Sequence, residues 1–90
     1  MRKELGKEKL DGRRTPVNKL GMISFAGKKA DCLVLNVSAN GAGLALASDV
    51  ALPLAFDLEI SGDRTRRHCL MVWRIERRLG VMFNGTVNLK

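Results

Sequence analysis

The residues with the clearest chemical potential lie in the segment NVSANG, Asn36–Gly41, which joins two short apolar runs. An asparagine amide and a serine hydroxyl supply one carbonyl acceptor, two N–H donors and a rotatable hydroxyl. These groups suit the edge of a nucleotide base if a strand continues through Asn36 and Ser38, because positions i and i+2 then share a face. Asn40-Gly41 is also a strong hairpin signal, since a type I′ turn needs positive φ at both central residues. The segment therefore has two interpretations, half of a binding site or a turn capped by its own side chains.

Positive charge is concentrated in two parts of the chain. The formal net charge is +7, with a net +4 in residues 1–19, −2 in residues 20–62 and +4 in residues 63–78. Such an arrangement attracts anions, for example a nucleotide, a nucleic acid or an acidic membrane surface. Surface charge that serves solubility alone is the alternative.

No set of residues with catalytic spacing is present, so the sequence predicts a protein that is not an enzyme. It has no paired acidic motif, no nucleophile beside a base and no Walker-type glycine loop. His68 has no sequence partner at ligand or catalytic spacing and is given no role. Cys32 and Cys69 form no C-x-x-C motif, so we expect two buried reduced thiols, no metal and no cofactor.

No apolar run approaches the roughly 18 residues of a membrane span. The opening residues MRKELGKEKL also have no signal-peptide apolar region. We therefore predict a cytoplasmic protein without membrane insertion.

Short β-rich runs separated by turn residues predict an all-β fold of about six antiparallel strands, closed into a barrel so that no edge is exposed. In the run LAFDLEI, Phe56, Leu58 and Ile60 should point inward. We predict a flexible basic arm over residues 1–12, a barrel domain over 13–84 and a tail over 85–90. The runs that carry the strand pattern are 19–25, 30–37, 42–47, 54–60, 65–75 and 79–83.

The spacing Asn36-x-Ser38-x-x-Gly41 resembles the [D/N]-x-S-x-x-G motif of PilZ domains, small bacterial β-barrels that bind cyclic di-GMP. The run CLMVWRIERRLGVMF, residues 69–83, is similar to the late hairpin of that family, and the resemblance covers about residues 9–84. It implies a six-stranded antiparallel PilZ-type β-barrel with a basic N-terminal arm.

The family's second motif is R-x-x-x-R, placed just before the first strand. Arginine suits the ligand because a planar guanidinium pairs bidentately with phosphate or with guanine N7 and O6 and can stack on a purine. This sequence has Arg13-Arg14 in tandem instead. Counting back from Asn36, Arg14 takes the second motif position and Leu10 the first, while Lys9 lies four residues before Arg13.

The resemblance implies a role for each matching residue. Asn36 and Ser38 would read a guanine edge, and Gly41 would let the backbone come close to the ligand. Trp73 would stack on guanine, although packing in the barrel is the ordinary role of a lone tryptophan. The hairpin arginines Arg74, Arg77 and Arg78 are expected to form a solvated basic rim. The predicted ligand-binding set is Arg13, Arg14, Asn36, Ser38 and Gly41, with Trp73 and Lys9 as additional candidates.

Three functions follow from these observations. The first is a cyclic di-GMP receptor that transmits binding of this second messenger to a protein partner. The second is a PilZ-like protein-interaction adaptor that no longer binds the nucleotide, which the incomplete arginine motif allows. The third is a small nucleic-acid-binding barrel. Its basic charge favours it, but four aromatic residues are few for a protein that stacks bases.

Overall fold

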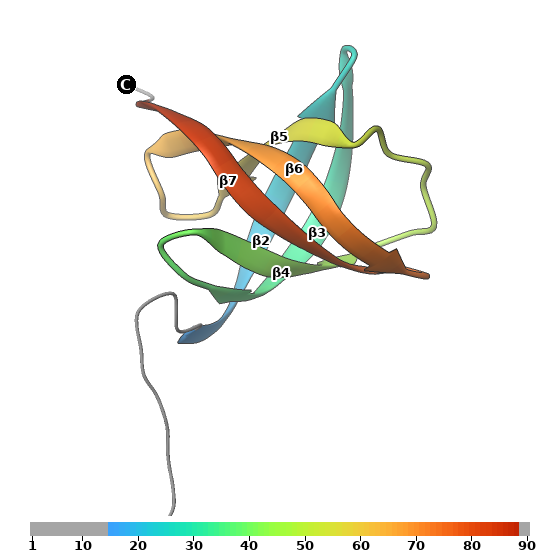
Figure 1. Ribbon diagram of the computed structural model, residues 1–90, viewed down its shortest axis with the longest axis horizontal. Coiled ribbons are helices and arrows are strands. Elements are labelled where there is room, and N and C mark those ends of the chain that lie inside the picture. Colours follow the sequence, from blue (N-terminus) through green and yellow to red (C-terminus); the bar gives the residue numbers. More distant parts are fainter. Residues whose placement is uncertain (1–14, 89–90) are drawn as a thin grey trace, which may run out of the picture.

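The structure is a computed structural model that describes residues 15–88, which form six strands and no helix. All pairings are antiparallel and the sheet closes into a barrel in the order β2-β3-β4-β7-β6-β5 (Figure 1). The predicted all-β, six-stranded antiparallel barrel is thereby confirmed, while the arm at residues 1–12 lies outside the described part. The strands are β2 (Thr15–Phe25), β3 (Lys28–Val37), β4 (Gly41–Leu46), β5 (Ala55–Ile60), β6 (Thr65–Ile75) and β7 (Arg78–Asn88).

The core is mainly aliphatic, as the scarcity of aromatic residues predicts. Phe56, Leu58 and Ile60 of β5 alternate inward as predicted. Cys32 and Cys69 are also buried, and they pack as small apolar side chains. The buried hydrophobic residues of the described barrel are Ile23, Cys32, Val34, Ala42, Leu44, Leu46, Phe56, Leu58, Ile60, Cys69, Leu79 and Val81.

Two of the register shifts in the barrel place Asn36 and Trp73 on its outer face. The register shifts between Val34 and Asn36 in β3 and between Met71 and Trp73 in β6. Simple alternation from Val34 would turn Asn36 into the core. Each bulge adds one residue and reverses the alternation, so Asn36 and Trp73 lie on the outer face.

The last strand is longer than its apolar pattern indicates. β7 pairs with β6 as far as Thr65 opposite Asn88, which extends it beyond the predicted domain boundary at residue 84. The segment from Asn84 to Val87 is exposed, so it has no apolar alternation to mark it as a strand. Within residues 15–88, no helix exists that could cross a bilayer.

Candidate functional site

The turn after β3 is built by Ser38. Its Oγ accepts hydrogen bonds from the backbone N–H groups of Asn40 and Gly41, both at 3.2 Å. The Ser38 N–H donates to the Gly41 carbonyl at 2.8 Å and closes the turn. Because β3 ends at Val37, Ser38 lies beyond the strand and does not share a strand face with Asn36. The serine is therefore engaged locally, and its contact with a ligand stays a prediction.

The predicted type I′ turn at Asn40-Gly41 is wrong. Neither residue has positive φ, whereas the turn between β2 and β3 has positive φ at both Ala26 and Gly27. The Ser38 hydroxyl holds the Asn40 and Gly41 amides in a turn that needs no left-handed residue. Gly41 is glycine for another reason, because a Cβ at this position would collide with the backbone carbonyl of Val81 on β7.

A row of paired residues crosses four strands on the outer face of the barrel. Asn36 on β3 pairs with Gly43 on β4, Gly43 pairs with Gly80 on β7, and Gly80 pairs with Trp73 on β6. We call Asn36, Gly43, Gly80 and Trp73 the glycine row. It joins two residues of the predicted site that are 37 positions apart in the sequence.

The two glycines allow the outer side chains to lean toward each other. The Asn36 amide lies 2.9–3.3 Å from the point where a Gly43 Cβ would stand. The Trp73 indole occupies the corresponding space above Gly80. Since paired strands lie about 4.8 Å apart, the amide and the indole rest on adjacent positions. The row therefore presents a hydrogen-bonding group beside an aromatic surface.

The hydrogen bonding of Asn36 and the exposure of Trp73 make this surface suitable for a flat polar molecule. Asn36 Oδ1 accepts a hydrogen bond from the Gly43 N–H at 3.1 Å, which fixes the amide against β4. Trp73 is 44% exposed, although a lone tryptophan in a small barrel is expected to pack inside. The indole covers Gly80 with one part of its surface and leaves the rest open to a stacking partner.

The predicted basic ligands Lys9, Arg13 and Arg14 lie outside the described residues. The described chain begins at Thr15, which pairs with Val37, and the next residue, Pro16, pairs with Asn36. The two arginines directly precede Thr15 in the sequence. The chain therefore enters the barrel at the end of β3 that carries Asn36 and the Ser38 turn.

The hairpin between β6 and β7 does not form a uniformly solvated basic rim. The Arg74 guanidinium donates to the Val50 carbonyl at 2.7 Å and to Asp49 at 3.1 Å, and its Nε donates to the Glu76 carbonyl. Arg77 donates to the Ala47 carbonyl at 3.3 Å. These two arginines fasten the connection between β4 and β5, which runs along one side of the barrel in Figure 1. Arg78 does not take part.

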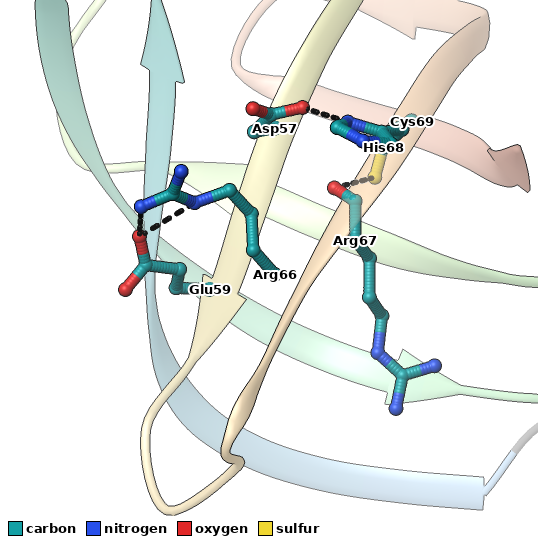
Figure 2. A network of polar contacts seen from close by, with 6 residues as sticks. All are labelled: Asp57, Glu59, Arg66, Arg67, His68 and Cys69. Atoms are coloured by element: carbon teal, nitrogen blue, oxygen red, sulfur yellow. Dashed lines mark hydrogen bonds and ion pairs between the residues drawn. The ribbon is translucent and has the colours of Figure 1, made fainter. Parts of the chain in front are cut away.

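A second polar group on the outer face could not be found by sequence spacing. His68 Nδ1 contacts the Asp57 carboxylate, and Arg66 pairs with Glu59 at 3.1 Å, both from β6 to β5 (Figure 2). The partners are 11 and seven residues apart and meet only because β5 and β6 are paired. Asp57 stands between His68 and Ser24, which pairs with it from β2. This order separates the histidine from the serine and differs from a catalytic triad, where histidine stands between them.

One hollow of the described barrel lies apart from the glycine row. It has a volume of about 650 Å³, spans β2, β3 and β5, and includes the carboxylates of Asp31, Glu59 and Asp63 in its lining. The net positive charge of the chain attracts anionic ligands, but the negative carboxylates in this hollow would repel them. We therefore place the candidate site at the glycine row, which is an open surface.

Comparison with known proteins gives no relative. No family model matches the chain, and neither a curated protein nor a solved structure shows significant similarity to it.

Proposed function

We propose that this chain is a PilZ-type receptor for cyclic di-GMP. The observation that carries the proposal is the glycine row, in which Asn36 and Trp73 from distant parts of the sequence share one outer surface. The same two residues belong to the motifs that resemble the family. An amide beside an open indole is suited to a guanine, which offers a flat face and a hydrogen-bonding edge.

In this proposal the guanine stacks on Trp73 and places one edge toward the Asn36 amide. Arg13 and Arg14 come from the segment that precedes β2 and bind phosphate or the second guanine. Ser38 and Gly41 keep the turn in shape next to this surface. Binding would hold the arginine-bearing segment against the barrel, and that rearrangement would be the signal passed to a partner.

The incomplete arginine motif limits the expected affinity. Leu10 stands where the family has its first arginine, and Lys9 offers a single ammonium in place of a planar fork. A charged hydrogen bond contributes about 1.5–3 kcal/mol, so loss of one arginine weakens binding by about one to two decades. We expect micromolar rather than nanomolar binding.

Calorimetric titration of the full chain with cyclic di-GMP at physiological salt tests the proposal. GTP tests whether binding requires a cyclic dinucleotide, and cyclic di-AMP tests whether it requires guanine as the base. Selective saturable binding of cyclic di-GMP is the expected result. Absence of binding would favour the protein-interaction adaptor, and salt-dependent binding of any oligonucleotide would favour the nucleic-acid barrel.

A further inference from the structure

The arginines of the barrel differ in whether their guanidinium groups contact other described residues. Arg66 pairs with Glu59, and Arg67 pairs with Asp63 and lies 4.7 Å from the centre of the Phe83 ring. Arg74 and Arg77 are fastened to the connection between β4 and β5. Among residues 15–88, the remaining arginines are Arg64 and Arg78, which are both exposed and make no hydrogen bond or ion pair with another described residue.

Arg78 lies on the same outer surface as the glycine row. On β7, Leu79 and Val81 point into the core, so Arg78 and Gly80 point outward. The two residues are two positions apart on one strand, which places their Cα atoms about 7 Å from each other. Arg78 pairs with Ile75 and Ala45, whose side chains offer it no acceptor.

We propose that Arg78 is a specificity-determining residue that reads the O6/N7 edge of the guanine stacked on Trp73. The inference rests on the proposed function, because it assigns a contact to the same ligand. A base stacked on the indole lies further out from the sheet than the indole, where a long side chain from a neighbouring outward position can meet its edge. The arginine fork matches two adjacent acceptors, whereas adenine presents an amino donor in place of O6.

The test compares substitutions of Arg78 with an alanine substitution of a control residue, Arg64. Arg64 is also an exposed arginine without a described partner, but it precedes β6 and is nine residues from Trp73, about 30 Å along the strand. Calorimetric titrations with cyclic di-GMP and cyclic di-AMP are run on the wild-type chain, Arg78→Ala, Arg78→Lys and Arg64→Ala. Both alanine variants should fold normally, because each removes an exposed side chain without a partner. Urea unfolding checks this.

We expect Arg78→Ala to lower the affinity for cyclic di-GMP by about tenfold or more and to reduce its preference over cyclic di-AMP. Arg78→Lys should keep the charge but recover little of the preference, and Arg64→Ala should bind within about twofold of wild type. Equal weakening toward both nucleotides would assign Arg78 to the shared phosphates and overturn the base-edge assignment. Wild-type affinity in Arg78→Ala would refute the inference alone, whereas no binding by wild type would refute the proposed function.

Discussion

At the residue scale, the glycines at positions 41 and 80 meet different kinds of neighbour. A Cβ at Gly41 would strike the Val81 backbone carbonyl, which cannot move without disturbing the pairing of β4 with β7. A Cβ at Gly80 would strike the Trp73 indole, a side chain that is 44% exposed and able to swing away. Gly41 therefore allows the close pairing of β4 with β7, and Gly80 makes room for the Trp73 indole.

These neighbours predict opposite effects for the two alanine variants. Gly41→Ala should lower the free energy of unfolding by about 2–3 kcal/mol through overpacking. Gly80→Ala should change it by less than about 1 kcal/mol but displace the indole and weaken ligand binding. Urea unfolding and calorimetric titration of both variants check this. A folded Gly80→Ala variant with wild-type affinity would show that the indole position is irrelevant to binding.

Because the Ser38 hydroxyl caps the turn, its removal should lower the stability of the fold. A hydroxyl that only contacted a ligand would have no such effect. Ser38→Ala removes the acceptor of two backbone N–H groups and should lower the free energy of unfolding by about 1–2 kcal/mol. Ser61→Ala is the matched control, because this exposed serine follows β5 and its hydroxyl makes no hydrogen bond among the described residues. Unchanged stability of Ser38→Ala together with lost ligand binding would contradict the turn-capping role.

At the scale of elements, the strands were predictable but the faces of their key residues were not. The alternating pattern of β5 and the apolar runs of β3 and β6 identify strands and most of the core. The two bulges reverse the alternation before Asn36 and Trp73, and they depend on register between strands. No local propensity determines that register, so the approach of Asn36 to Trp73 across Gly43 and Gly80 could not be predicted from the sequence.

The same limit explains two other results. The Asp57 and His68 side chains meet through the pairing of β5 with β6, so neither residue predicts the other. The type I′ prediction failed at Asn40-Gly41 because a hydroxyl at Ser38 stabilises a different turn. Residue type indicated a turn correctly, but side-chain hydrogen bonding selected its conformation.

The cysteines on β3 and β6 predict how stability depends on pH. Burial raises the pKa of Cys32 from 9.0 to about 11 and the pKa of Cys69 from 9.0 to about 12. A raised folded-state pKa means that the folded protein holds the thiol proton more tightly than the unfolded chain does. The stabilisation from the neutral thiols is fully present below pH 9 and is lost as the pH rises toward 11 to 12.

Urea unfolding between about pH 8 and pH 10.5 checks this prediction. The control is the double variant Cys32→Ala, Cys69→Ala, in which lysine and arginine titrate as in wild type. The free energy of unfolding should decline more steeply above pH 9 in the wild type than in the control. Parallel declines would show that the buried thiols do not contribute.

At the scale of the whole molecule, the charge of the chain exceeds what the barrel alone carries. Residues 15–88 hold a net +3 of the total +7, and the remaining +4 lies outside them. Ion pairs and carbonyl contacts already occupy four of the arginines on the barrel. The described cations outside these contacts are Lys19, Lys28, Lys29, Arg64 and Arg78, and Arg78 is the one that lies two positions from Gly80 of the glycine row.

The composition of the chain provides a direct probe of that surface. Trp73 is the only tryptophan and the chain has no tyrosine, so intrinsic emission excited at long wavelength reports on the glycine row alone. The most direct measurement is a fluorescence titration of the full chain with cyclic di-GMP, corrected for ligand absorption with free N-acetyltryptophanamide. Stacking of guanine on the indole predicts saturable quenching at micromolar ligand, with the same dissociation constant as calorimetry. Emission that stays unchanged up to about 1 mM ligand would contradict binding at this surface.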